Sequence, residues 1–229
     1  MAHVPVEGPR RWTHRVVEAA FRRFRPARFR AFQQALGIEA GTRVLDVGGT
    51  PYFWKMGAEL GLSMPQVTIV NLESPREPLP EGMRWVRADA RRLPFADSSF
   101  DAVFCNSVIE HLGSRQAQQE LVQEIRRVGR GYFVQTPSRR FPVETHFVTL
   151  FLHWFPKRVQ KKWMLRLSLA GTEGRLPREA FEPFLNDLLL LDARELQALF
   201  PEAEMRVERF LGLEKSATVY FSSSSPPRP

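Results

Sequence analysis

The sequence predicts an α/β fold in which a mostly parallel sheet carries helices on both faces. Five short runs, most of them apolar, have the length of buried strands, at 43–48, 67–72, 84–87, 100–107 and 131–135. A helix entry at Thr50-Pro51 follows the first of these runs, and apolar residues with helical spacing follow the fourth. Because strands that alternate with helices build parallel sheets, we expect a three-layer arrangement.

Local signals predict where the first helices lie. The apolar face of Thr13–Arg25 predicts one lead-in helix, and the stretch 26–36, with Pro26 at its first position, predicts a second. After the first strand, Thr50 is a candidate helix cap, and Pro51 lacks the N–H that would otherwise have no partner. The sequence therefore predicts two helices before the sheet begins and a third directly after its first strand.

The later part of the chain carries equally local signals. Ser114 is a candidate cap for the helix after the fourth strand. The segment Asp192–Glu195 has the pattern of a capping box. Two final strands, Glu204–Phe210 and Glu214–Phe221, are expected to pair as a hairpin through a turn at Gly212.

The length of 229 residues suits one domain with an insertion. We expect a flexible arm at 1–11, a single domain at 12–221 with an insertion at about 141–190, and a disordered Ser/Pro tail at 222–229. The single cysteine, Cys105, excludes an internal disulfide framework, and no Cys/His group has metal-ligand spacing, so no metal site is predicted. With no signal-peptide pattern and no membrane-spanning apolar stretch, a cytoplasmic protein is expected.

The formal net charge of +8 favours encounter with phosphate-rich partners or anionic membranes. The basic residues, however, are spread along the chain, and no separate RNA-binding module or aromatic–basic motif is present. Nucleic acid is therefore an alternative partner and not the expected one.

A glycine-containing loop, Asp46-Val-Gly48-Gly49-Thr50, follows the first strand. Ligands of open α/β sheets bind at the carboxyl ends of strands, and glycines let a ligand approach the backbone. The three-glycine spacing of a dinucleotide site is missing, and the Asp46 carboxylate would repel a diphosphate. A carboxylate suits a ligand with an ammonium and a sulfonium. The loop thus favours S-adenosylmethionine (SAM) over NAD, with a merely structural turn as the alternative.

Polar side chains also follow the second and third strands. Asn71 and Glu73 are two residues apart and point to one side, so that Glu73 can accept both hydroxyls of a ribose with Asn71 assisting or replacing it. After the third strand, Asp89 can accept a hydrogen bond from an adenine amino group, and Ala90 offers its backbone. The alternatives are an exposed loop acid for Glu73 and an ordinary helix or turn cap for Asp89.

The fourth strand and its surroundings, Leu93–Leu112, resemble the same region of the ubiquinone/menaquinone-type class I methyltransferases. Together with Val44–Gly48 and Asp89, the order and spacing match that family over roughly residues 40–137. The resemblance implies a Rossmann-like three-layer sandwich whose seven-stranded, mostly parallel sheet ends in an antiparallel strand. It also implies SAM as methyl donor and a substrate site built by the N-terminal helices and a helical insertion after strand five.

The same resemblance implies a set of cofactor contacts. The methionine part of SAM would be lined by Asp46, Gly48 and Gly49. The ribose would be held by Asn71 or Glu73, and the adenine by Asp89. The space beside the donor, at the end of the fourth strand, would be bordered by Asn106 and Ser107. Thr50 departs from the family, which usually has a further glycine there, and its Cβ would crowd the cofactor.

The segment Gln135–Phe147 resembles a subgroup of these enzymes in which a Thr-Pro turn precedes Glu-x-His. His146 can then act as a general base near neutral pH, oriented by Glu144, and His111 is a rival base. The alternatives are a loop that Glu144 and His146 pin by hydrogen bonds, and a packing or capping role for His111.

The insertion combines an apolar, aromatic run at 147–155 with basic residues at 156–162. This composition fits a lid over a hydrophobic substrate, peripheral contact with an anionic membrane, or ordinary helices that cover the sheet. We therefore expect a SAM-dependent methyltransferase acting on a small-molecule or lipid acceptor. An RNA-directed methyltransferase and a non-catalytic scaffold or sensor are the alternatives, and the oligomeric state is left open.

Overall fold

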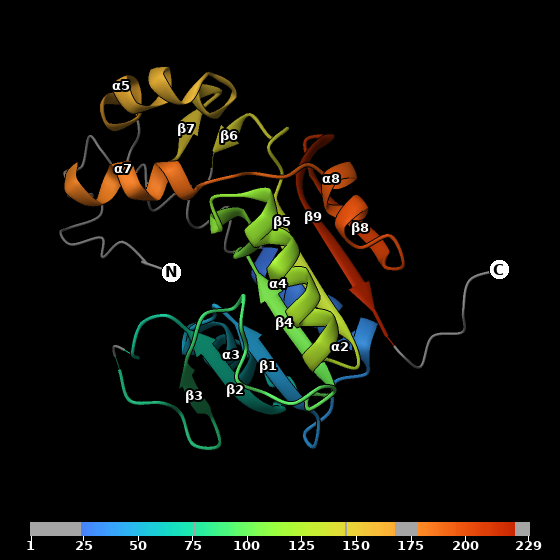
Figure 1. Ribbon diagram of the computed structural model, residues 1–229. Helices are drawn as coiled ribbons and strands as arrows, with labels where there is room; N and C mark the ends of the chain where they lie inside the picture. Colours follow the sequence, from blue (N-terminus) through green and yellow to red (C-terminus); the bar gives the residue numbers. More distant parts are fainter. Residues whose placement is uncertain (1–23, 76, 145, 168–177, 223–229) are drawn as a thin grey trace.

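The protein is described by a computed structural model that covers residues 24–222 apart from 76, 145 and 168–177 (Figure 1). The strands of its main sheet are β1 Arg43–Val47, β2 Gln66–Asn71, β3 Arg84–Arg87, β4 Ala102–Asn106, β5 Tyr132–Pro137, β8 Glu204–Phe210 and β9 Leu213–Phe221. They lie in the order β3-β2-β1-β4-β5-β9-β8. The first five are mutually parallel, and β9 is antiparallel to both of its neighbours. This confirms the predicted seven-stranded sheet with an antiparallel last strand.

Helices cover both faces of this sheet, as Figure 1 shows. Helices α2 (Phe24–Leu36) and α3 (Pro51–Glu59) pack on one face, and α4 (Arg115–Val128) and α8 (Ala193–Leu199) on the other. Side chains that alternate along each strand feed two separate apolar cores. One core holds Phe29, Phe32, Val44, Trp54, Phe104 and Phe133, and the other holds Leu45, Val47, Val103, Leu121, Ile125 and Leu196. The three-layer, Rossmann-like architecture is thus confirmed.

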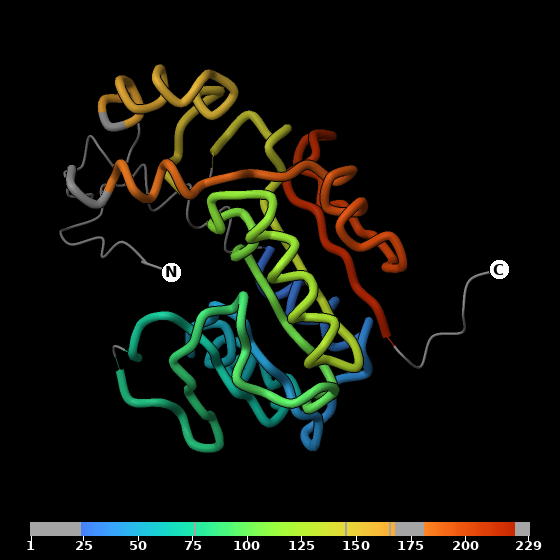
Figure 2. The backbone as a smooth tube through the Cα atoms, viewed as in Figure 1, coloured from blue at the N-terminus to red at the C-terminus, as the bar shows by residue number. Residues whose placement is uncertain are grey.

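The insertion after β5 begins with a small antiparallel hairpin, β6 (Val143–Glu144) and β7 (Thr149–Leu150), and continues with helices. These are the short η2 (Leu152–Trp154), α5 (Lys157–Leu167) and α7 (Arg178–Asp187). They enclose an apolar core of their own, made by Phe147, Leu152, Met164, Phe181, Leu185 and Leu188. Figure 2 shows this segment, yellow to orange, lying at one end of the sheet. Within the described residues, no helix has the length and apolar character needed to cross a membrane.

The helix starts agree with the local signals in part. Helix α2 begins at Phe24 rather than at Pro26, so the predicted boundary between the two lead-in helices was wrong. Pro26 still lies in the first turn, where its missing N–H breaks no intrahelical bond. The rest of the first predicted helix, like the arm at 1–11 and the tail from 223, lies outside the described residues. Gly37, at a φ of +60°, follows the end of α2.

The predicted caps also differ in outcome. Ser114 accepts a hydrogen bond from the N–H of Ala117 at 3.1 Å, and Asp192 and Glu195 form both bonds of the capping box. Thr50 occupies the position before α3, but its side chain makes no cap hydrogen bond, so the predicted capping role was wrong. Pro51 supplies the start of α3 instead.

Candidate functional site

The glycine loop after β1 lies at the point where the strand order reverses, between β1 and β4. Gly48 has a φ of +70°, and its N–H donates to the carbonyl of Val70 at 2.7 Å. A Cβ on Gly48 would lie 2.8 Å from a methyl group of Val108, and a Cβ on Gly49 would lie 1.8 Å from a carboxylate oxygen of Asp46. Both positions therefore require glycine, and the loop presents backbone at the crevice where α/β sheets bind ligands.

Asp46 lies beneath this loop and is 1% exposed. Its Oδ2 accepts a hydrogen bond from Trp54 Nε1 at 2.7 Å, whereas its Oδ1 has no hydrogen-bond partner among the described residues. Burial raises the pKa of this carboxyl group to about 7, although the Trp54 hydrogen bond lowers it. A cationic group brought to the loop would stabilise the charged form, which is the chemistry that a ligand ammonium offers.

Asn71, at the end of β2, holds the glycine loop. Its side-chain amide donates to the carbonyl oxygens of Gly48 at 3.3 Å and Gly49 at 3.1 Å. Its Oδ1 accepts from the N–H of Glu73 at 3.4 Å. The amide is thus occupied in positioning the loop, and a contact of Asn71 with a ribose would have to replace these hydrogen bonds.

Asp89 follows β3 and is engaged by Arg91. Its carboxylate oxygens accept from the Arg91 guanidinium at 2.6 to 3.1 Å, and Oδ1 also accepts from the N–H of Arg91 at 2.9 Å. The hydrogen bond from the guanidinium lowers the pKa of Asp89. Asp89 therefore does cap a turn, and an adenine contact would have to share its oxygens with Arg91. Ala90 packs half-buried against the core.

The end of β4 is held from both sides. Arg28 of α2 donates to Asn106 Oδ1 at 2.8 Å, and Glu208 of β8 holds the same guanidinium through an ion pair of 2.9 Å. Ser107 has a left-handed backbone with a φ of +56°, and both its N–H and its hydroxyl donate to Gln135 of β5. The chain turns sharply here into the short helix η1 (Ile109–His111).

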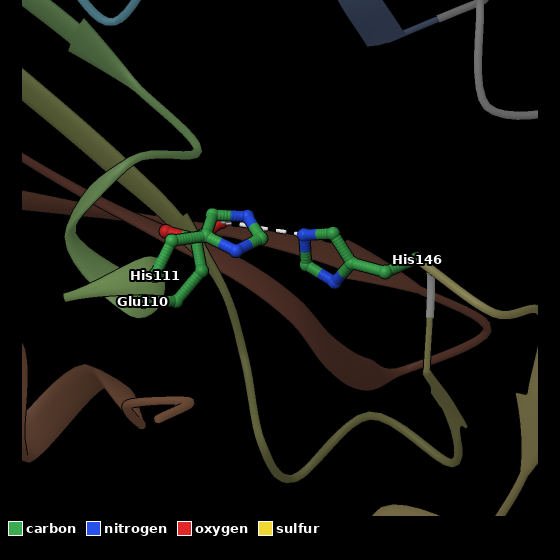
Figure 3. A group of neighbouring side chains, drawn as sticks. All are labelled: Glu110, His111 and His146. Atoms are coloured by element: carbon green, nitrogen blue, oxygen red, sulfur yellow. Dashed lines mark ion pairs between the residues drawn. The ribbon is translucent and has the colours of Figure 1, made fainter. Parts of the chain in front are cut away.

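Two acids and two histidines meet beyond this turn, and Figure 3 shows three of them. His146 Nδ1 lies 2.5 Å from Glu144 Oε1, and Glu144 also accepts from the N–H groups of His146 and Phe147. The opposite ring nitrogen, His146 Nε2, faces Glu110 Oε1 at 3.8 Å, and His111 Nε2 lies 3.9 Å from the same oxygen. We call Glu110, His111, Glu144 and His146 the acid–histidine cluster.

Burial and charge set the protonation of this cluster. Burial raises the pKa of Glu110 to about 7, although His146 lowers it. Burial, with His146 nearby, lowers the pKa of His111 to about 2, so His111 is neutral. Burial lowers the pKa of His146 too, but the Glu144 and Glu110 carboxylates outweigh it and the net direction is upward. The predicted partnership of Glu144 with His146 is therefore present in the structure, and its role in catalysis stays a prediction.

The insertion closes over the acid–histidine cluster. The Phe184 ring of α7 lies 5.1 Å from the ring of His111 and 5.8 Å from that of His146, measured between centroids. The N–H of Leu189 donates to the carbonyl of Glu110 at 2.6 Å, and the N–H of Gly113 donates to the carbonyl of Asp187 at 2.9 Å. The segment after α7 thus fixes η1 to the insertion.

Sequence analysis missed Glu110, which the fold brings between the two predicted histidines. The signal was an acid inside an otherwise apolar run, next to His111 and directly after a buried strand. Trp54 and Arg28 were also missed as partners of Asp46 and Asn106, because nothing in the sequence marks which helix residue faces a given strand end.

The strand order and the glycine loop at its reversal define a class I methyltransferase fold. Residues 43–134 match the family model described as a methyltransferase domain. This segment belongs to the class I, SAM-dependent methyltransferase family, as the sequence predicts.

Of two relatives of this chain, one is named a methyltransferase and the other is named for biotin biosynthesis. Methyltransferase GfsG of Streptomyces halstedii is 33% identical over 107 residues, which are 42% of this chain and 38% of that protein. The biotin biosynthesis bifunctional protein BioHC of Cellvibrio japonicus is 37% identical over 95 residues, 40% of this chain and 19% of that one. The matches thus span well under two thirds of these relatives. A SAM-dependent methyltransferase from Methanosarcina mazei has the same fold, with a TM-score of 0.54, 16% identity and coverage of 80% of this chain and 92% of that one.

Proposed function

We propose that this chain transfers a methyl group from SAM to a small-molecule or lipid acceptor. The observation that carries the proposal is the loop Gly48–Gly49 at the strand-order reversal, with the unsatisfied Asp46 oxygen beneath it. When bound, SAM supplies a methyl group already activated by its sulfonium. The protein's contribution is then mainly to position the two reactants.

Five of the predicted residues have a role in cofactor binding in this proposal. Gly48 and Gly49 let the methionine part approach the backbone, and the free oxygen of Asp46 offers a negative partner for its ammonium. Glu73 and Asp89, which follow the adjacent strands β2 and β3, would hold the ribose and the adenine. These contacts agree with a ligand that carries positive charge and no phosphate.

His146 is the candidate proton acceptor. Its Nδ1 is occupied by Glu144, so Nε2 is the atom that would take a proton from the acceptor. The Glu144 and Glu110 carboxylates outweigh burial and raise the pKa of His146, so a smaller fraction of the ring is neutral and available as a base at a given pH. An acceptor whose nucleophile carries no proton would need no such base.

The surface of the insertion supports this acceptor class. Leu150, Phe151, Trp154 and Phe155 are exposed on it, next to the basic helix α5. Exposed apolar and basic groups together favour a hydrophobic or lipid acceptor, with peripheral membrane contact as a secondary possibility, in a cytoplasmic setting. Many of the arginines already pair with carboxylates. Examples are Arg91, Arg115, Arg126, Arg127, Arg139 and Arg140. This pairing argues against a phosphate-binding surface for RNA.

Calorimetric titration of the full chain with SAM tests the proposal. We expect one SAM per chain, and weaker binding by Asp46→Asn, because the amide lacks the charge that the ammonium would meet. The matched control is Asp97→Asn, since Asp97 is an exposed acid that pairs with Arg127 away from the loop. A folded sample that binds no SAM would contradict the proposal. Equal SAM affinity of the Asp46→Asn and Asp97→Asn variants would contradict the role assigned to Asp46.

A further inference from the structure

We propose that Glu110, His111 and His146 bind a divalent cation of the kind that prefers imidazole ligands, with Zn²⁺ as the reference. The proposal concerns metal binding alone and does not depend on methyl transfer, and a cation bound at His146 Nε2 would exclude the base role of that atom. The ligand atoms of these three residues all lie within 4.8 Å of one another (Figure 3). Two histidines and one glutamate are a known ligand set for catalytic zinc, which keeps a further position open.

The spacing of the ligand atoms is close to that of a formed site. Glu110 Oε1 lies 3.8 Å from His146 Nε2 and 3.9 Å from His111 Nε2. Ligands bound at ~2.1 Å in a tetrahedral arrangement stand about 3.4 Å apart. The two distances to Glu110 would have to shorten by about half an ångström to form the site, and the ligand atoms of the two histidines, which lie within 4.8 Å of each other, by up to about 1.4 Å.

Glu144 prepares His146 as a ligand. Its carboxylate can only accept hydrogen bonds, so the ring nitrogen Nδ1 at 2.5 Å must carry the proton. The lone pair of a neutral His146 ring is then on Nε2, which faces Glu110. Glu144 itself is fixed by the N–H groups of His146 and Phe147. A carboxylate that orients a histidine in this way is the usual outer partner of a metal ligand.

The side chain of Glu110 gives an independent reason to expect a bound cation. Its side chain is fully buried, and Oε2 accepts from the Thr136 hydroxyl at 3.0 Å. Its Oε1 has no hydrogen-bond partner among the described residues, and it is this oxygen that faces both histidines. A buried carboxylate oxygen without a partner is costly, and a bound cation would satisfy it.

The charges of the acid–histidine cluster also fit a divalent cation. Glu110 and Glu144 are both fully buried and together would contribute two negative charges. A divalent cation would neutralise both carboxylates, whereas a proton on His146 compensates only one of them. His146 is 17% exposed and His111 is 7% exposed, whereas both carboxylates are fully buried, so a cation would reach the cluster from the histidine side.

Zinc titration of the untagged full chain, freed of metal by a chelator and without SAM, tests the proposal. We expect one Zn²⁺ per chain, and a visible absorption band of the tetrahedral type when Co²⁺ replaces it. Glu110→Gln keeps the shape and the Thr136 contact but removes the charged ligand, and should weaken Zn²⁺ binding at least about 100-fold. Glu144→Gln should weaken it about 10- to 100-fold, as expected for an outer partner.

His153→Ala is the matched control, because His153 is a partly buried histidine of the insertion that lies outside the cluster and bonds to the carbonyl of Arg139. It should bind Zn²⁺ like the unaltered chain. Circular dichroism of each variant shows whether it is folded. The proposal fails if the folded chain binds no stoichiometric Zn²⁺, or if Glu110→Gln binds it as tightly as His153→Ala does. Since SAM is absent throughout, either result leaves the proposed transferase activity to its own test.

Discussion

Replacing Asp46 with asparagine should stabilise the protein above pH 7 and change its stability little near pH 4. The carboxyl group is 1% exposed, and burial raises its pKa from 3.8 to about 7 despite the hydrogen bond from Trp54. The unfolded chain releases this proton near pH 4, whereas the folded chain keeps it until about pH 7. The folded state therefore loses stability, relative to the unfolded state, as the pH rises through this window.

The size of the effect follows from the two pKa values. The difference between 3.8 and about 7 corresponds to about 4 kcal/mol, at 1.36 kcal/mol for each pKa unit. Asparagine does not titrate, and its amide oxygen can still accept from the indole of Trp54. The variant's gain in free energy of unfolding should thus grow by about 1.4 kcal/mol per pH unit between about pH 4 and 7, and then stay constant.

Urea denaturation followed by circular dichroism, without added SAM, measures this difference at each pH. Comparing the two proteins at the same pH removes the contribution of other titrating groups, including Glu110, whose pKa is also raised to about 7 by burial. A difference in free energy of unfolding that does not change between pH 4 and 8 would refute the reasoning, because Asp46 would then titrate alike in both states.

Three further substitutions, two of them compared with a second variant, test the loop and the helix caps. Gly49→Ala should lower the melting temperature strongly, because the new Cβ would lie 1.8 Å from a carboxylate oxygen, whereas Gly41→Ala has nothing within 4 Å; equal melting temperatures would contradict this packing. Ser114→Ala should lower the free energy of unfolding, measured by urea denaturation, by about 1 kcal/mol, and Thr50→Ala should leave it almost unchanged, because of these two residues only Ser114 makes a cap hydrogen bond. Equal losses of stability in the two variants would contradict this difference in capping. Asn71→Ala should weaken SAM binding in calorimetry roughly tenfold, as two hydrogen bonds to the loop are lost; unchanged affinity would show that the amide does not shape the site.

The parts of the fold that were predictable are those set by neighbours in sequence. The apolar run that contains β4 is buried on both faces of the sheet, and such a run has few other stable positions. The hairpin of β8 and β9 needed only two strand patterns and a turn at Gly212, which has a φ of +78°. Ser114 and Asp192 cap helices through atoms three residues away. Each of these features is decided within a few residues.

The features that escaped prediction depend on contacts between distant segments. The strands β6 and β7 have two residues each, too few for any periodicity to show. Glu110 meets His146 only because β4 and β5 are neighbours whose following loops share one edge. Likewise, the amide of Asn71 is taken up by the loop after β1, so a residue suited to a ribose by type is occupied by the protein itself.

The position of β9 has a consequence for how the chain is made. Although it is the last strand along the sequence, it lies inside the sheet, between β5 and β8. During synthesis from the N-terminus, the backbone N–H and C=O groups along the outer edge of β5 have no strand partner until residues 213–221 emerge from the ribosome. An uncovered strand edge is a template for pairing with other chains. During the interval between the synthesis of β5 and that of β9, the nascent protein therefore carries an open strand edge through which it can aggregate.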